Sequence, residues 1–176
     1  MEISPKGPAV CRLRWIGFDV DGVMTDGGII ISDQGQETKR FHSRDGHALK
    51  MLIRAGFKVA IITGRKSRVV ELRAKDLGIE EVYQGVFDKL AVYNEVLIKH
   101  GLETSETAFA GDDVVDLPVL LRAGVAMAPA DACAEALAAA HFVSPSKGGH
   151  GAVRDMAEFI LKGQGRWDEL IARYRV

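Results

Sequence analysis

The sequence contains few of the residues that mark several common protein classes. Only two cysteines, Cys11 and Cys133, occur among 176 residues, and their separation matches neither a disulfide framework nor a zinc-ligand pattern. No apolar run approaches the roughly 18 residues of a membrane span, and Pro5 and Pro8 interrupt the stretch that a signal peptide would need unbroken. With 23 basic and 24 acidic residues, the net charge of −1 argues against a whole-molecule attraction to nucleic acid or anionic membrane. We therefore expect a cytoplasmic protein without nucleic-acid or membrane partners.

The composition is otherwise that of an ordinary globular protein. Hydrophobic residues make up 47% of the chain and charged residues 27%, and the length suffices to bury a core. These values predict a single domain over residues 1–176 that starts with a loose arm over 1–10. Within it we expect a β-hairpin at 27–41, built around a polar Gly-containing loop, and a C-terminal tail with helices at 145–176.

Apolar runs of strand length alternate with segments of helical periodicity along the chain. Strands are predicted at 13–18, 57–62, 82–83, 107–110, 125–128 and 141–143, and helices at 45–56, 67–77, 89–100, 117–122, 131–140 and 152–161. Strands that are continuously apolar and separated by helices indicate a parallel sheet covered on both faces. The predicted fold class is α/β, a doubly wound, mainly parallel, Rossmann-like sheet with helices on both faces and a small β-hairpin inserted after the first strand.

Chemically active side chains follow successive strands at the carboxyl edge of this sheet, where ligands bind in doubly wound folds. Asp19 and Asp21 come directly after the first strand. Two carboxylates on a Gly-rich turn can hold a hard divalent cation while one of them attacks or exchanges protons. Thr63, Gly64 and Arg65 follow the second strand of the sheet, and their hydroxyl and free N–H groups at a helix start suit a phosphate.

Four more charged residues extend this pattern. Lys89 opens a helix, where a cation is unfavourable by roughly 0.3–1 kcal/mol unless a negative group lies near. Asp112, Asp113 and Asp116 follow strand 107–110, and five converging carboxylates would have raised pKa values unless cations neutralised them. Mg²⁺, Lys89 and Arg65 are the available counter-charges. The lack of Cys and His at these strand ends favours an oxygen-ligated metal over zinc or copper.

Each motif alone also fits a turn, a helix cap or a solvated lysine, but together they carry a resemblance. In order and spacing, four motifs of the chain resemble the signature motifs of the haloacid dehalogenase-like phosphatases. They are D-x-D-G starting at residue 19, T-G-R starting at residue 63, Lys89, and G-D-D-x-x-D starting at residue 111. From about residue 15 to 174 the chain is similar to their small capless branch, typified by the 3-deoxy-D-manno-octulosonate 8-phosphate (KDO 8-phosphate) phosphatases. The resemblance implies a Mg²⁺-dependent phosphomonoesterase that hydrolyses this acidic sugar phosphate in lipopolysaccharide sugar synthesis.

The resemblance also implies a role for each motif residue. Asp19 is the expected nucleophile, which forms an aspartyl-phosphate, and Asp21 is the expected proton donor and acceptor. Thr63, Gly64 and Lys89 are expected to hold the phosphoryl group. The implied ligands of Mg²⁺ are the Asp19 side chain, the Asp21 backbone carbonyl and the Asp112 carboxylate, with Asp113 or Asp116 behind them.

Substrate recognition and assembly depend on less specific signals. Arg65, Arg44, His150 and Arg154 are further candidates for contacts with the anionic substrate, together with a basic cluster of Lys39, Arg40, His42 and Arg44. The Gly148–Gly151 segment is flexible enough to fold over a site. An exposed Ile29–Ile31 run on a lone hairpin predicts burial against another subunit or, alternatively, within the chain. The resemblance implies a homotetramer whose neighbouring subunit acts as the cap.

Three other functions stay open at this point. A nine-carbon, sialic-acid-like sugar phosphate is an alternative substrate, because its phosphatases share the capless architecture. A phospho-acceptor signalling domain uses similar residues, but it places the acceptor Asp after the third strand, where this chain has Gln84 and Gly85. An inactive structural homologue is disfavoured because all the motif residues are retained.

Overall fold

Six parallel strands form the centre of the computed structural model, which describes residues 8–175. In spatial order the strands are β5 (Glu81–Gln84), β4 (Lys58–Thr63), β1 (Trp15–Phe18), β6 (Thr107–Ala110), β7 (Val125–Ala128) and β8 (Phe142–Val143). All residues of β1, β6 and β7 are buried, which accounts for their continuously apolar sequences. The order reverses next to β1, so the loops after β4, β1 and β6 meet at one edge. The predicted doubly wound sheet is confirmed.

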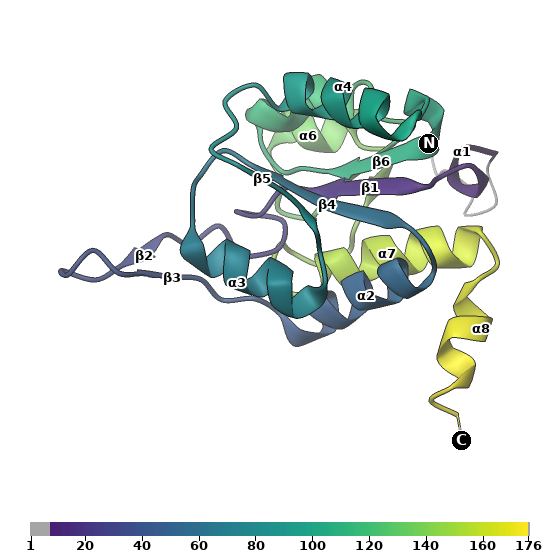
Figure 1. The fold of residues 1–176 in the computed structure, drawn as a ribbon, viewed down its shortest axis with the longest axis horizontal. Coiled ribbons are helices and arrows are strands. Elements are labelled where there is room, and N and C mark those ends of the chain that lie inside the picture. Colours follow the sequence, from purple (N-terminus) through teal and green to yellow (C-terminus); the bar gives the residue numbers. More distant parts are fainter. Residues whose placement is uncertain (1–7, 176) are drawn as a thin grey trace.

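Helices cover both faces of the sheet, as predicted (Figure 1). One face carries α2 (Ser43–Arg54), α3 (Arg68–Leu77) and α7 (Ala152–Gly163), and the other carries α4 (Lys89–His100), α5 (Leu117–Leu120) and α6 (Ala134–Ala139). Successive side chains of a strand point to opposite faces. Accordingly Ile16 packs into the core beneath α2 and α7, whereas its neighbour Trp15 packs into the core beneath α4.

Local sequence signals set the ends of these helices. The Ser67 side chain accepts a hydrogen bond from the Val70 N–H and begins α3, and Asp88 accepts one from the Ala91 N–H and begins α4. Gly101 ends α4 with a φ of 58°, a left-handed conformation that glycine adopts without strain. The predicted 131–140 helix is shorter than expected, because Cys133 is its N-cap and α6 starts at Ala134.

The chain ends add two short helices. The predicted loose arm over 1–10 lies partly outside the described residues. For residues 8–10 the prediction is wrong, because Pro8–Cys11 form a helical turn, α1. Val10 in this turn is buried, and its carbonyl accepts a hydrogen bond from Gln164. Near the C-terminus lies α8 (Trp167–Ala172), and two 3-10 turns, η1 (Thr104–Glu106) and η2 (Val114–Asp116), flank β6. None of the helices within residues 8–175 has the length and apolarity needed to cross a membrane.

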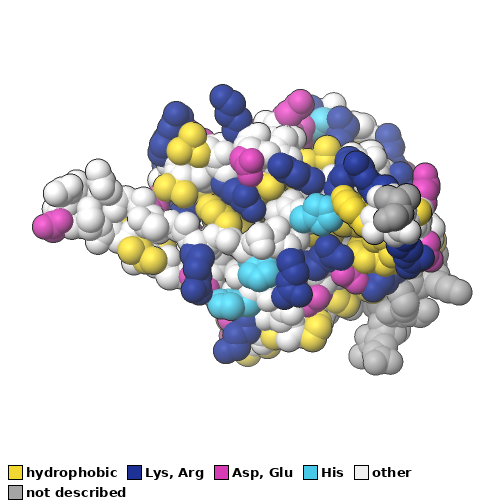
Figure 2. Space-filling model, turned by 90° about the horizontal axis from the view of Figure 1, so that it is seen from below, with side chains coloured by type: hydrophobic (Ala, Val, Ile, Leu, Met, Phe, Trp, Pro, Cys, Tyr) yellow, Lys and Arg dark blue, Asp and Glu magenta, His cyan; other side chains and the backbone are white. Residues whose placement is uncertain are grey.

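The predicted hairpin is present and projects from the body of the molecule (Figures 1 and 2). Its strands β2 (Ile30–Ile31) and β3 (Glu37–Thr38) are antiparallel and shorter than expected. Ile29, Ile30 and Ile31 are 46%, 55% and 55% exposed. Within the described part of the chain, this apolar run is therefore only about half covered, and the expectation that it is buried within the chain is wrong.

Candidate active site

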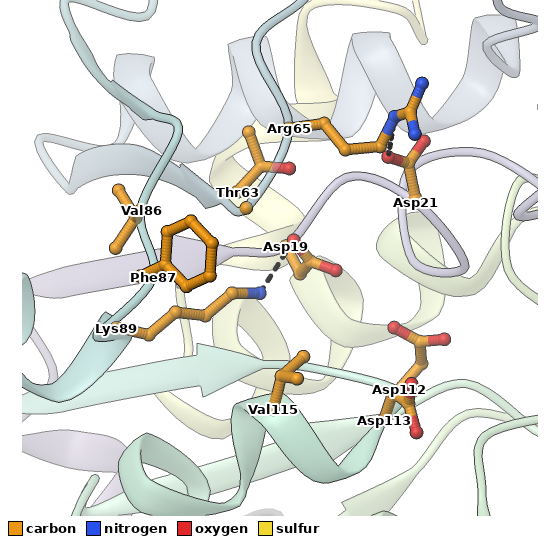
Figure 3. A pocket seen from close by; sticks show the side chains of 11 residues that line it. Asp19, Asp21, Thr63, Arg65, Val86, Phe87, Lys89, Asp112, Asp113 and Val115 are labelled. Atoms are coloured by element: carbon orange, nitrogen blue, oxygen red, sulfur yellow. Dashed lines mark ion pairs between the residues drawn. The ribbon is translucent and has the colours of Figure 1, made fainter.

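The predicted catalytic and phosphate-binding residues line one pocket at the carboxyl edge of the sheet, and fully buried Asp116 lies behind it (Figure 3). The pocket has a volume of about 330 Å³. Its lining comes from the turn after β1, the loops after β4, β5 and β6, and the first turn of α4, and consists of Asp19, Asp21, Thr63, Gly64, Arg65, Val86, Phe87, Lys89, Asp112, Asp113 and Val115. The strand order thus unites residues that are far apart in the sequence.

Lys89 is the buried cation of this pocket. Its Nζ lies 2.8 Å from Asp19 Oδ1 and 2.6 Å from Asp116 Oδ1, and its side chain is 3% exposed. Burial acts to lower the pKa of Lys89, but the two carboxylates outweigh it and raise the pKa above its ordinary value. The ammonium therefore stays charged. Its unfavourable place in the first turn of α4 is explained by these two acidic partners.

Asp19 and Asp112 have the strongly perturbed carboxyl groups of the site. Burial raises the pKa of Asp19 to about 6; the Asp116 charge adds to this shift, whereas Lys89 opposes it. Burial, followed by repulsion from Asp19, Asp116 and Asp113, raises the pKa of Asp112 to about 7. Both shifts show that negative charge at this position lacks sufficient compensation within the chain.

The same carboxylates fit a hard divalent cation. Asp19, Asp112 and Asp116 each place one oxygen so that the three oxygens lie within 4.8 Å of one another. Asp112 Oδ1 is buried and has no hydrogen-bond partner among residues 8–175, which is the state expected of a metal ligand. Gly22, with a φ of 91°, passes so close to Asp112 that a Cβ would collide with this carboxylate. The turn after β1 and the loop after β6 are therefore packed directly against each other.

Asp116 has a different part in the cluster, because both of its oxygens already have partners. Its side chain is fully buried; Oδ1 accepts from Lys89, and Oδ2 accepts from the backbone N–H groups of Asp112 at 3.0 Å and Asp113 at 3.3 Å. Asp113 is exposed and caps η2 by accepting from the Val114 N–H. The geometry thus assigns Asp116 to orienting Asp112 and Lys89.

Asp21 faces the other side of the pocket, toward Arg65 (Figure 3). The Arg65 Nε lies 3.8 Å from Asp21 Oδ2, and Asp21 Oδ1 accepts a hydrogen bond from Lys39. The Lys39 side chain is 1% exposed, so its expected contact with a sugar carboxylate, as part of a basic surface cluster, is wrong. Lys39 lies between exposed Thr38 and Arg40, and no local sequence signal distinguishes it.

Three candidate substrate ligands do not line the pocket of their own chain. Arg44 is exposed on α2, and the exposed His150 ring places Nδ1 2.8 Å from the Gly148 carbonyl oxygen. The Arg154 Nε lies 2.6 Å from Glu158, and the guanidinium stacks 4.9 Å from the Trp167 ring centre. The Arg154 backbone N–H donates to buried Asp45, and the contacts with Glu158 and Trp167 hold the side chain away from the pocket.

The Gly148–Gly151 segment is held in place rather than free to fold over the site. Gly148 and Gly149 are buried, and the Gly149 N–H donates to the Val23 carbonyl at 3.1 Å. A Cβ on Gly148 would collide with the Gly22 carbonyl. The segment therefore braces the turn that carries Asp19 and Asp21, and the expectation of a flexible flap is wrong for this chain.

The pocket also has an apolar side that sequence reasoning missed. Val86 and Phe87 follow β5, and Val115 belongs to η2. Phe87 is fully exposed and Val115 is 58% exposed. The position of Phe87 after a strand, at the carboxyl edge of the sheet, could have indicated its place in the pocket. An aromatic side chain, unlike a carboxylate, does not by itself indicate a catalytic role.

Comparison with known proteins identifies the family. The model of the haloacid dehalogenase-like hydrolases matches residues 42–124. The KDO 8-phosphate phosphatase of Yersinia pestis is 44% identical over 155 residues, covering 88% of this chain and 83% of that protein. The Escherichia coli K12 enzyme of the same name is 40% identical over 158 residues, covering 90% and 84%.

A solved structure extends the comparison to the fold. The KDO 8-phosphate phosphatase of Moraxella catarrhalis, crystallised with a magnesium ion, a phosphate ion and KDO, superposes with a TM-score of 0.92 at 39% identity. The match covers 94% of this chain and 95% of that one. The chain accordingly belongs to the KDO 8-phosphate phosphatase family of the haloacid dehalogenase-like hydrolases and is a phosphoric monoester hydrolase.

Proposed function

We propose that this chain hydrolyses KDO 8-phosphate to KDO and inorganic phosphate. The observation that carries the proposal is the pocket itself, in which buried Lys89 and the acidic pair Asp19 and Asp112 lie together with Thr63 at the end of β4 and Gly64 in the loop after it. This combination offers a nucleophile and charge neutralisation to a phosphate monoester. Family membership over nearly the whole chain supports the sugar substrate.

Asp19 is the proposed nucleophile. One of its carboxylate oxygens attacks phosphorus, so a new oxygen–phosphorus bond forms while the ester oxygen–phosphorus bond breaks. Lys89, 2.8 Å from Asp19 Oδ1, orients this carboxylate and lies where it can neutralise the phosphoryl oxygens. Thr63 and the Gly64 N–H bind the same oxygens from the other side of the pocket. The product of this step is an aspartyl-phosphate and an alkoxide.

Asp21 moves the proton in both halves of the reaction. It gives a proton to the leaving alkoxide as the first ester bond breaks. It then takes a proton from the water that attacks the aspartyl-phosphate, which regenerates the Asp19 carboxylate and releases inorganic phosphate. The two steps balance, because the proton that Asp21 gives to the sugar is replaced by one from water.

The acidic cluster fits Mg²⁺ as the cofactor. Asp19 and Asp112 would hold the ion through carboxylate oxygens and Asp21 through its backbone carbonyl, while Asp113 and Asp116 support the loop behind them. When bound, Mg²⁺ supplies positive charge that offsets the carboxylates and the phosphate.

We further propose that the protein acts in the cytoplasm as a homotetramer. The exposed Ile29–Ile31 run on the projecting hairpin supports assembly, because its burial against another copy would remove apolar surface from water. The pocket is open to solvent beside fully exposed Phe87, and a neighbouring subunit would supply the cap. Arg44, His150 and Arg154, which do not line the pocket of their own chain, would reach substrate only in such an assembly. Both cysteines are free, in keeping with a reducing compartment.

A substrate panel tests the proposed function. We would measure Mg²⁺-dependent phosphate release from KDO 8-phosphate, a nine-carbon acidic sugar phosphate and a neutral sugar phosphate. A kcat/KM at least about tenfold higher for KDO 8-phosphate is expected from a site selected for one acidic sugar. Preference for the nine-carbon compound would replace the proposed substrate and keep the chemistry. No release from any of the three would overturn the proposal.

A further inference from the structure

Lys39, at the base of the hairpin, is a buried cation that the proposed mechanism does not use. It follows β3, and its side chain is 1% exposed. Burying an ammonium is costly unless carboxylates accompany it, and Lys39 has two such partners. It donates to Asp21 Oδ1 and lies 3.4 Å from Glu37 Oε1.

A second cation joins the same two carboxylates. The Arg65 Nε lies 3.8 Å from Asp21 Oδ2, and its Nη2 lies 3.4 Å from Glu37 Oε1. Ser67, the N-cap of α3, donates its hydroxyl to the other oxygen of Glu37. The hydrogen bond from Ser67, assisted by Lys39 and Arg65, holds the pKa of Glu37 below its ordinary value, so Glu37 remains an anion. The hairpin is thereby tied both to Asp21 and to the loop after β4.

The two oxygens of Asp21 differ in their partners. Oδ1 accepts from Lys39, whereas Oδ2 is buried and has no hydrogen-bond donor among the described residues. A carboxyl group with one oxygen anchored by a buried cation has its plane and rotamer fixed, and the Arg65 Nε faces the other oxygen at 3.8 Å. Lys39 is in turn held by Glu37, which lies two residues earlier in the chain.

We propose that Lys39, held by Glu37, is the positioning residue for Asp21. By anchoring Oδ1 it keeps the Asp21 carboxyl group in the orientation needed for proton transfer to the leaving oxygen of the sugar. This inference rests on the proposed function, in which Asp21 is the proton donor. Lys39 itself touches neither the nucleophile nor the phosphoryl group, so it acts only through Asp21.

The inference predicts a dependence on the leaving group. A sugar alkoxide needs a proton as it departs, whereas the phenolate of p-nitrophenyl phosphate departs without one. The parameter to compare is kcat/KM, because it reports only the steps through the first bond cleavage and excludes hydrolysis of the aspartyl-phosphate. Loss of Asp21 positioning should therefore lower kcat/KM for KDO 8-phosphate and spare p-nitrophenyl phosphate.

The experiment uses the full-length protein with Mg²⁺ and both substrates. Lys39→Met, which keeps the length of the side chain and removes its charge, is expected to lower kcat/KM for KDO 8-phosphate at least about 30-fold and for p-nitrophenyl phosphate less than about threefold. Lys50→Met is the matched control, since Lys50 is a half-exposed lysine on α2 paired with Asp76 at 3.9 Å, and both rates should stay unchanged. In an Asp21→Asn background, Lys39→Met is expected to add less than about twofold, because it acts through Asp21.

Glu37→Gln keeps the test decisive if Lys39→Met does not fold, as judged by thermal unfolding. It leaves the ammonium in place and loosens its anchor, so a selective fall of at least about fivefold for KDO 8-phosphate is expected. An equal fall for both substrates, or no fall in either variant, would overturn the inference while the proposed function stands. A wild type that releases phosphate from neither compound would overturn both.

Discussion

The buried carboxylate of Asp116 provides the sharpest test of how the site is built. Replacing it with Asn preserves its shape but substitutes an NH₂ group for one oxygen. In one orientation the NH₂ group meets the Lys89 ammonium, and in the other it meets the backbone N–H groups of Asp112 and Asp113. Either orientation opposes two donors across a contact that is fully buried.

The expected loss of folding free energy in Asp116→Asn follows from these contacts. Breaking a buried ion pair by removing one partner costs about 3–5 kcal/mol, and the acceptor oxygen retained by Asn places Asp116→Asn at the lower end, about 3 kcal/mol. For a domain of this size each kcal/mol lowers Tm by about 2–4 °C, so a fall of about 6–12 °C is expected. Lys89 keeps its contact with Asp19 at 2.8 Å, which limits the loss.

Thermal unfolding followed by circular dichroism measures this effect, with Asp113→Asn as the control. Asp113 stands in the same loop but is exposed, and it caps η2, a position at which Asn serves as well as Asp. The Tm of the Asp113→Asn variant is therefore expected to stay within about 2 °C of the wild-type Tm. If Asp116→Asn shifted Tm as little as Asp113→Asn, the ion pair with Lys89 would not hold the loop after β6 in place.

Three further predictions concern the phosphoryl site, the metal and the hairpin. Lys89→Met should lower kcat at least about 100-fold, because its charge is needed most in the transition state, and a change confined to KM would contradict that role. Burial and neighbouring carboxylates raise the pKa of Asp112 from 3.8 to about 7. Between these pH values the metal-free folded protein binds more protons than the unfolded chain, so its stability falls as pH rises. Mg²⁺ should therefore raise Tm more above pH 7 than at pH 5, and equal shifts would refute the assignment of Asp112 as a ligand. Ile30→Asp should lower the molar mass seen by light scattering, whereas an unchanged mass would show that the hairpin is not an interface.

The sequence predicted the parts of the site that obey general rules. Apolar runs located β1, β4 and β6, and the residues that follow such strands meet at one edge in any doubly wound sheet. Lys89 stood out because a cation at a helix start needs an acid nearby, and the structure supplies Asp19 and Asp116. These features depend on periodicity and on the order of elements along the chain, which a sequence contains.

The sequence did not reveal contacts that depend on tertiary placement. Lys39 reads as one of several basic residues, and only the return of the hairpin to the sheet buries it against Asp21. From the sequence, Arg154 was expected to bind an anion. In the structure its guanidinium stacks on the Trp167 ring of α8 and does not line the pocket. Gly148 reads as flexible, whereas the close approach of the Gly22 carbonyl makes it a packing position. Each of these outcomes depends on a partner distant in sequence.

The proposed reaction begins with attack of Asp19 on the phosphate ester, and the Asp19→Asn variant isolates this step. Mg²⁺-dependent phosphate release from KDO 8-phosphate would be measured for the wild type and for Asp19→Asn, with folding of both checked by thermal unfolding. The folded variant is expected to retain less than about 0.1% of the wild-type kcat, because an amide cannot form the aspartyl-phosphate. A folded Asp19→Asn protein with more than about 10% of the wild-type kcat would contradict attack by Asp19.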